Sequence, residues 1–93
     1  MIVRYRRQAL ADIDEIHSYL RERSPQGAQN VLRAIYAAVQ LIAEQPYSSP
    51  ATDIPDVRVK VLTRYRFKVF YTVVNDDAVE IIHVRHTSRR PWL

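Results

Sequence analysis

The hydrophobic pattern of this 93-residue chain changes its period once, and that change limits the fold more than any other feature. Between Gln8 and Gln45, hydrophobic residues recur every three or four positions, as they do along one face of an α-helix. From Val57 onward, hydrophobic and polar residues alternate, which is the pattern of β-strands. Residues 46–56, which include three prolines, separate the two parts. The sequence therefore predicts a helical first half and a sheet-forming second half.

A short strand at Ile2–Arg6 and a first helix from Gln8 to about Arg23 are predicted at the start of the chain. The helix is amphipathic, with one apolar face and one charged face. Its apolar positions are Leu10, Ile13, Ile16, His17 and Leu20, and the residues expected to point away from them are Asp12, Asp14 and Glu15.

A second helix is predicted to begin at Pro25, because Ser24 is a typical N-cap and proline is favoured at the first helical position. It ends near Gln45, since Pro46 disfavours helical geometry in the residue before it. Its buried stripe consists of Ala28, Val31, Ile35, Val39 and Ile42. Because the joint between the two helices is tight, they are expected to form a hairpin.

Three strands are predicted in the second half, where β-branched and aromatic residues are frequent. Their ranges are Val57–Leu62, Tyr65–Val74 and Val79–Val84. The link between the first two is short enough for a hairpin, and Asn75-Asp76-Asp77 between the last two has typical turn residues. Consecutive strands joined in this way form an antiparallel meander.

The expected fold is therefore a single α+β domain over residues 1–93, with the order β-α-α-β-β-β. A helix hairpin of this kind buries its apolar stripe most economically by packing on one face of a twisted, mainly antiparallel sheet. The other face, with Arg58, Lys60 and Arg66 or their neighbours, is expected to stay open.

Positive charge is concentrated in the second half of the chain. Residues 1–56 hold six Lys or Arg against seven Asp or Glu, whereas residues 57–93 hold eight against three. Between Asp56 and Asp76 there is no acidic residue. Such a region attracts phosphates or an acidic protein, and the alternative is a solvated polar surface.

Composition argues against several other kinds of site. The chain has no cysteine, which excludes disulfides and thiolate metal ligands and fits a reducing cytoplasm. No hydrophobic run reaches the length of about 18 residues that a membrane span needs, and no signal peptide or membrane association is expected. His83 and His86 have only Glu80 as a neighbouring carboxylate, so neither a metal site nor a cofactor is expected.

The order of elements and three segments together resemble the RelE/ParE superfamily of toxins from bacterial type II toxin-antitoxin systems. The segments are Tyr65-Arg66-Phe67-Lys68-Val69-Phe70-Tyr71, Asp77-Ala78-Val79-Glu80-Ile81-Ile82 and the ending His83-Val84-Arg85-His86-Thr87-Ser88-Arg89-Arg90-Pro91. The resemblance covers nearly the whole chain. It implies a cognate antitoxin partner, ParD-like or a related small DNA-binding protein, and a hetero-oligomer with it.

The superfamily divides by target. ParE-like members are regarded as poisons of DNA gyrase that act by binding, whereas RelE-like members are ribosome-dependent ribonucleases that cut mRNA. The resemblance implies a role in target or phosphate binding for a set of basic residues, namely Arg58, Lys60, Arg64, Arg66, Arg85, Arg89 and Arg90. Arg85 would also be catalytic in a ribonuclease, with His86.

The C-terminal ending favours the ParE-like branch. Where a RelE-like pattern places a tyrosine after the last arginine, this chain has Arg90-Pro91-Trp92, and tryptophan has no ionisable proton to give. Histidine, with an ordinary pKa of about 6.5, could take that role at His86. The alternatives for His86 are a hydrogen bond that holds the tail onto the sheet and a catalytic role. A third hypothesis for the chain is a non-catalytic module that holds nucleic acid through its phosphates alone.

Overall fold

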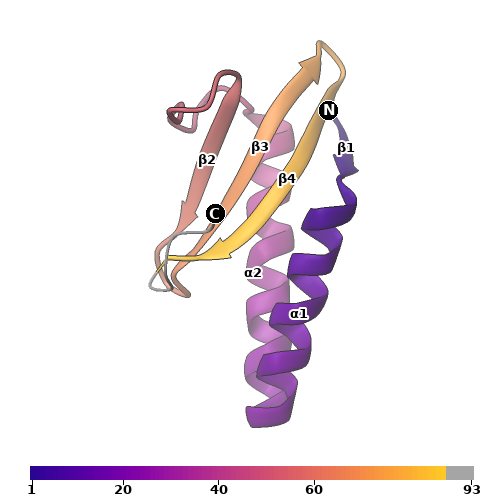
Figure 1. The fold of residues 1–93 in the computed structure, drawn as a ribbon, viewed down its shortest axis with the longest axis vertical. Helices are drawn as coiled ribbons and strands as arrows, with labels where there is room; N and C mark the ends of the chain where they lie inside the picture. The colour runs from indigo at the N-terminus through magenta and orange to yellow at the C-terminus, as the bar shows by residue number, and fades with distance from the viewer. Residues whose placement is uncertain (88–93) are drawn as a thin grey trace.

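The computed structural model describes residues 1–87, and their elements follow the predicted order β-α-α-β-β-β (Figure 1). The elements are β1 (Ile2–Tyr5), α1 (Arg7–Arg23), α2 (Pro25–Glu44), β2 (Val57–Leu62), β3 (Phe67–Asn75) and β4 (Ala78–His86). The α+β class is confirmed, and the predicted helix ends lie within one residue of the observed ones.

The four strands form one sheet in the order β1-β4-β3-β2. β2, β3 and β4 are antiparallel neighbours, as the meander required, and β1 joins the sheet by pairing in parallel with β4. Figure 1 shows α2 behind the sheet and α1 beside α2, below β1 and next to the edge of β4, with both helices extending past the lower end of the sheet. The sheet therefore has one face covered by helices and one face without them.

The predicted helix joint at Ser24 is confirmed. Ser24 is extended, and its hydroxyl accepts a hydrogen bond from the backbone N–H of Gly27 at 3.0 Å. Pro25 follows in the first turn, where its missing N–H costs nothing because that donor has no helical partner. One residue thus ends α1 and caps α2, which folds the two helices back on each other.

The hydrophobic core lies between the hairpin and the sheet. Tyr71, Val69, Val79 and Ile81 on the strands and Ile35 on α2 have no measurable exposure. The Tyr71 hydroxyl donates a hydrogen bond to the carbonyl of Pro46, so the ring is buried with its one polar atom satisfied. Tyr71 thereby ties the centre of the sheet to the beginning of the loop 46–56.

Two predictions for the first helix are wrong. Leu10, expected on the buried face, is 50% exposed, and Asp12, expected to point away, is only 5% exposed. Asp12 lies three residues after the fully buried Ala9 and one before Ile13, so it shares their helix face. The buried face of α1 is therefore rotated relative to the prediction and carries a carboxylate.

The short length of β1 explains why a carboxylate is tolerated there. β1 pairs only with residues 78–81 of β4, although β4 continues to His86. The chain turns away from the sheet after Tyr5 and enters α1, which then covers the remaining edge of β4 (Figure 1). That edge presents a backbone N–H of the strand to the helix and offers a donor to Asp12.

Candidate functional site

The basic residues of β2 lie on the helix side of the sheet. Arg58 is paired with Tyr71 and Lys60 with Val69, and residues directly opposite each other in a sheet share a face. Of the two alternatives for the open face, the one with Arg58 and Lys60 is therefore wrong, and the one with their neighbours holds for β2. Their neighbours Val57, Val59 and Val61 lie there instead.

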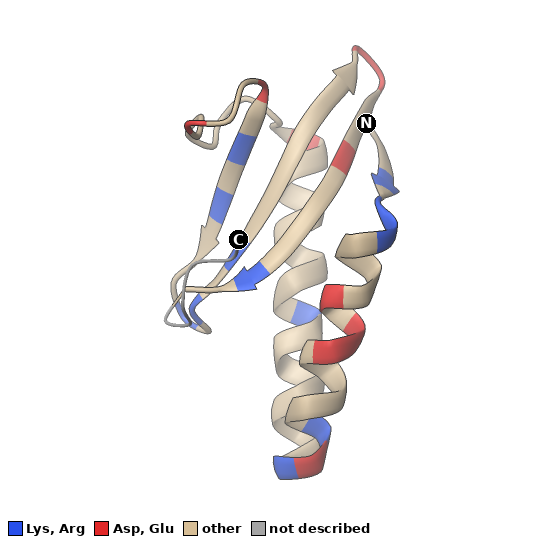
Figure 2. Ribbon diagram, in the orientation of Figure 1, with Lys and Arg blue, Asp and Glu red and all other residues tan. Residues whose placement is uncertain are grey.

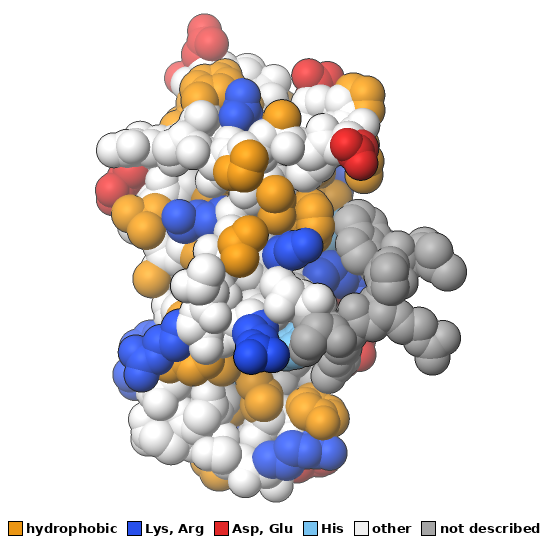
Figure 3. Space-filling model, turned by 90° about the vertical axis from the view of Figure 1, so that its left-hand side faces the viewer, with side chains coloured by type: hydrophobic (Ala, Val, Ile, Leu, Met, Phe, Trp, Pro, Cys, Tyr) orange, Lys and Arg blue, Asp and Glu red, His pale blue; other side chains and the backbone are white. Residues whose placement is uncertain are grey.

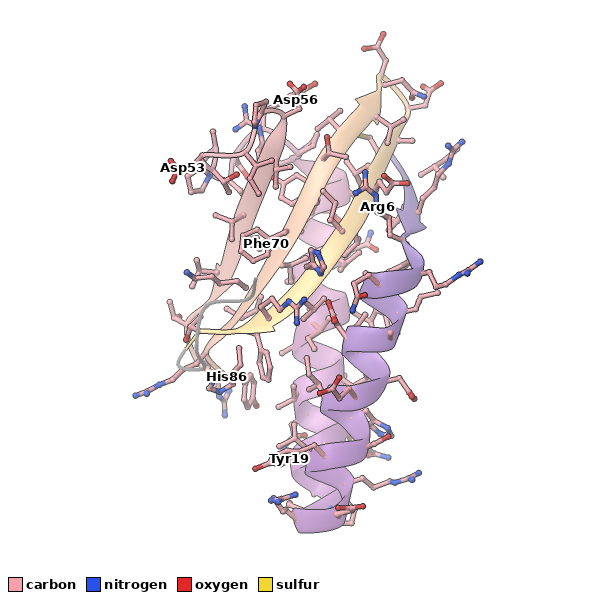
Figure 4. The ribbon with its side chains drawn as sticks, in the orientation of Figure 1. Arg6, Tyr19, Asp53, Asp56, Phe70 and His86 are labelled. Carbon is pink, nitrogen blue, oxygen red and sulfur yellow. The ribbon has the colours of Figure 1, made fainter. Side chains whose placement is uncertain are left out.

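The open face beside β2 is consequently apolar rather than basic. Val59 is paired with Phe70, and Figure 4 shows Phe70 on the side of the sheet away from the helices. Val61 is paired with Lys68, and Lys68 is paired in turn with Arg85. Among the described residues, Lys68 and Arg85 place positive charge on this face close to the link between β2 and β3, and Arg4, paired with Glu80, places it at the β1 edge.

Arg58 holds the loop 46–56 against the sheet. Its guanidinium donates to the carbonyls of Ser49 at 2.7 Å and Tyr47 at 3.4 Å, and it lies 5.2 Å from the centre of the Tyr47 ring. Ala51 also forms an isolated antiparallel bridge with Arg58. A side chain engaged in this way stabilises the loop and is held in one direction by it.

Lys60 belongs to an open groove of about 710 Å³ between α2 and the β2–β3 link. The α2 side is a stripe of Asn30, Arg33, Ala34, Ala37, Ala38 and Leu41, and the sheet side is residues 60–65. Of the described residues that line this groove, three are cations, Arg33, Lys60 and Arg64, and none is acidic. The groove therefore combines a floor of small apolar side chains with a positively charged border.

The β2–β3 link carries two exposed arginines. Arg64 has its guanidinium 5.3 Å from the centre of the Tyr65 ring. Arg66 has a left-handed backbone, with φ of 60°, and its carbonyl accepts a hydrogen bond from the N–H of Thr87 at 2.7 Å. That hydrogen bond brings the end of β4 beside Arg66, so Arg66 and His86 occupy the same corner of the sheet.

Arg85 and His83 gather around the buried carboxylate of Asp12. Oδ2 of Asp12 accepts the backbone N–H of Val84 at 3.0 Å and lies 3.2 Å from Nδ1 of His83. Oδ1 accepts the amide of Gln8 at 2.9 Å and lies 3.8 Å from Nη1 of Arg85. The expectation that Glu80 is the only carboxylate near His83 is therefore wrong, because α1 supplies another one.

His86 lies on the opposite face from Arg85. It is paired with Phe67, and the two rings meet edge to face with centroids 5.0 Å apart. Figure 4 shows His86 at the lower end of the sheet. Arg85 is paired with Lys68 on the other face. Arg85 and His86, which the ribonuclease hypothesis names as catalytic, therefore point to opposite faces.

The predicted basic residues thus occupy several separate places. Lys60 and Arg64 share the groove, Arg58 holds a loop, Arg66 lies in the link, and Arg85 approaches Asp12. Figures 2 and 3 show Lys and Arg distributed along β2 and the lower end of the sheet, with hydrophobic side chains between them. Arg89 and Arg90 lie outside the described residues.

Sequence reasoning missed Asp12 and Arg33. The signal for Asp12 was its spacing, three residues after Ala9 and four before Ile16, which places it on the buried face. The signal for Arg33 was a second α2 stripe of Asn30, Ala34, Ala37 and Leu41, offset from the buried stripe. Both could be found by testing each charged residue against helical spacing.

Metal and membrane sites find no support in residues 1–87. That part of the chain has no group of three His, Cys, Asp or Glu side chains arranged to hold a metal ion. None of its helices is long and apolar enough to cross a membrane.

Solved structures with the same fold include chains from toxin-antitoxin systems. A chain of the chromosomal ParDE system from Pseudomonas aeruginosa superposes with a TM-score of 0.81 at 21% identity, covering 95% of this chain and 97% of that one. The isolated Escherichia coli RelE toxin superposes with a TM-score of 0.66 at 17% identity, covering 96% of this chain and 86% of that one.

Sequence comparison goes further than the fold. The protein Y4kP of Sinorhizobium fredii, which carries a toxin assignment, is 32% identical over 88 residues, spanning 95% of this chain and 90% of that protein. The model of the family described as the ParE toxin of the type II toxin-antitoxin system parDE matches residues 3–91. The chain therefore belongs to the ParE toxin family of type II toxin-antitoxin systems.

Proposed function

We propose that this toxin acts in the cytoplasm by binding DNA gyrase and blocking its cycle, without cutting RNA. The observation that carries the proposal is that the functional groups do not lie together. The basic residues occupy several separate places, and Arg85 and His86 lie on opposite faces of the sheet. Of the predicted set, we assign Arg66 and Arg85 to target contact, together with Arg89 and Arg90 beyond the described residues. Arg58 is assigned to the loop that it holds.

RNA cleavage and target binding differ in how closely their functional groups must lie together. Cleaving RNA without a metal requires a base for the ribose hydroxyl, positive charge at the phosphate and an acid for the leaving oxygen, all within reach of one phosphodiester. Arg85 points to the open face, whereas His86 lies on the helix side of the sheet with Arg58 and Lys60, so the phosphate-binding Arg85 does not converge with the other three. A binding surface makes no such demand, because contacts spread over a protein interface can each add to affinity.

Induced expression tests the proposal in cells. We expect growth arrest, loss of negative supercoiling in a reporter plasmid and accumulation of cleaved DNA, all relieved when the antitoxin is expressed as well. Plasmid topology is read on chloroquine gels, and translation is followed by pulse labelling. A culture that stops translating while its plasmids stay supercoiled would contradict the proposal.

The second candidate function is ribosome-dependent mRNA cleavage. One observation favours it, because the Thr87–Arg66 hydrogen bond holds His86 and Arg66 at one corner of the sheet. This function requires codon-phased cuts in ribosome-bound mRNA from a translating extract. It also requires that His86→Ala or Arg85→Ala abolish those cuts while the toxin remains folded.

For the antitoxin, we propose the groove between α2 and the β2–β3 link as a docking site. The alanines of α2 allow a close approach by another backbone, and the three bordering cations favour a segment with Asp or Glu beside its apolar residues. Charge complementarity therefore points to an acidic, amphipathic segment, which fits the type of partner implied by the family.

A charge reversal tests the groove directly. The double substitution Lys60→Glu, Arg64→Glu should weaken antitoxin binding by about tenfold or more, since it replaces attraction by repulsion at the groove border. Isothermal titration calorimetry with the purified antitoxin measures the change in Kd.

Lys68→Glu is the matched control, because Lys68 is a cation on the other face of the same sheet. Thermal unfolding of each variant separates lost binding from lost folding. Equal weakening by Lys68→Glu and by the groove variant would show that the groove is not where the antitoxin docks.

A further inference from the structure

Asp12 is the most deeply buried charged residue in the described part of the chain. It is 5% exposed, and its oxygens accept hydrogen bonds from Val84 N–H and from the amide of Gln8. A buried carboxylate is tolerated only where hydrogen bonds or opposite charges replace the lost water. Here the free edge of β4 supplies a donor, because β1 ends before it reaches Val84.

The side chain of Arg85 points from β4 toward Asp12 on α1. Its backbone is paired with Lys68, and two cations directly opposite each other on neighbouring strands repel. The guanidinium instead reaches to 3.8 Å from Oδ1 of Asp12, and its Nη2 lies 3.4 Å from Nδ1 of His83. Asp12 thus provides the negative charge that draws Arg85 away from Lys68 and toward α1.

We propose that Asp12 is a positioning residue for Arg85, which it holds at the edge of β4 in the orientation that contacts the target. The inference rests on the proposed function, in which Arg85 is one of the target contacts. Asp12 itself is buried and touches no target. It acts by joining α1 to β4 through Val84 and by fixing the direction of one arginine side chain.

Asp12→Asn is the informative variant, since an amide oxygen can still accept the Val84 N–H while the negative charge is lost. Asp12→Ala would leave that buried N–H without its acceptor and could prevent folding. The expected result is about tenfold weaker inhibition of gyrase supercoiling by Asp12→Asn, with the toxin still folded. Asp14→Asn, an exposed carboxylate on the same helix, is the matched control and should leave inhibition unchanged.

The decisive comparison repeats Asp12→Asn in an Arg85→Gln background. If Asp12 acts through Arg85, the second substitution adds nothing to the loss caused by Arg85→Gln alone, because the positioned group is already gone. Equal fold-losses in both backgrounds would overturn the proposal and make Asp12 a structural residue only. Full activity of Arg85→Gln would also overturn it, since a residue without a role needs no positioning.

A measurement that does not depend on gyrase separates this inference from the proposed function. The Nε–Hε resonance of Arg85 in a nitrogen-15 NMR spectrum should be dispersed and slow to exchange in the wild type, and should shift and broaden in Asp12→Asn. An unchanged resonance would refute the positioning role. If the wild type fails to inhibit gyrase while this resonance still depends on Asp12, the proposed target is wrong and the positioning role stands.

Discussion

At the scale of single residues, Arg58 is expected to affect stability more than target binding. Its guanidinium satisfies two loop carbonyls, at Ser49 and Tyr47, that have no helix or strand partner. Arg58→Ala removes these charge-assisted hydrogen bonds, and we expect the free energy of unfolding to fall by about 1–2 kcal/mol. Urea unfolding followed by circular dichroism measures the difference.

Arg64→Ala is the control for this experiment, because Arg64 is exposed in the β2–β3 link. Surface substitutions of this kind change stability by less than about 0.5 kcal/mol. If Arg58→Ala were as stable as the wild type but failed to inhibit the target, Arg58 would be a contact residue after all.

Tyr5 is expected to make the stability depend on pH in the alkaline range. Burial, and to a smaller extent the neighbouring Tyr36, raise the pKa of Tyr5 above its ordinary value of 10.0. The two rings meet edge to face with centroids 6.3 Å apart, which joins β1 to α2. Because the folded state binds this proton more tightly than the unfolded state, unfolding becomes easier as the proton is lost.

The contribution of Tyr5 is therefore fully present below pH 10 and declines as the pH rises through the raised pKa of the folded state. Tyr5→Phe should remove this part of the decline, which thermal unfolding between about pH 8 and pH 11 would detect. An identical alkaline decline in wild type and Tyr5→Phe would show that another group is responsible.

Asp12 shows where residue-scale prediction failed. A charged residue on a helix is normally exposed, and that rule placed Asp12 with Asp14 and Glu15 on the outside. Spacing alone would have placed it with Ala9 and Ile16 on the buried face. The sequence could not reveal the partner of Asp12. The N–H of Val84 has no strand partner only because β1 ends before it reaches that part of β4, and this leaves the N–H to Asp12.

At the scale of elements, the sharp joint between the helices is expected to depend on one hydroxyl. Ser24→Ala removes the cap on Gly27 N–H and should lower the free energy of unfolding by about 1 kcal/mol. Ser18→Ala, at an exposed position inside α1, is the control, since alanine there loses no cap. Guanidinium unfolding of both variants shows whether a lower free energy of unfolding comes from the missing cap or from the loss of any serine hydroxyl.

The extents of the helices were predictable, whereas the face of β2 was not. Ser24-Pro25 and Pro46 are local signals, and they located the ends of both helices to within a residue. Period-two alternation in β2 fixes which residues share a face but not which face is covered. β2 is an edge strand, where long cationic side chains can pass the helix and reach water, so Arg58 and Lys60 are tolerated on the helix side.

At the scale of the whole molecule, the sequence predicted the order and class of the fold, because they follow from the change of period and the short connections. It did not predict how the positive charge is divided. The basic second half becomes a groove border, a loop anchor and a cationic end of the sheet, and Figure 3 shows hydrophobic side chains between the Lys and Arg side chains on the side of the molecule that it presents. In the function that we propose, this division separates the antitoxin site from the target contacts.

The dispersed charge also sets an expectation for nucleic acid. A module that held RNA or DNA through phosphates alone would bind it directly, and its affinity would fall with salt by about one logarithmic unit per contacted phosphate. We expect only weak, non-specific binding from this toxin. Fluorescence anisotropy with labelled duplex DNA and single-stranded RNA at several salt concentrations measures it, and tight binding with a steep salt slope would favour the module.

The most direct test of the central claim uses one preparation of the purified toxin in two assays run in parallel. Gyrase is incubated with relaxed plasmid, and a translating extract is followed by primer extension on a reporter mRNA. The account predicts loss of supercoiling with trapped, cleaved DNA, relief by the antitoxin, and an intact mRNA. Codon-phased mRNA cleavage with normal gyrase activity would contradict it.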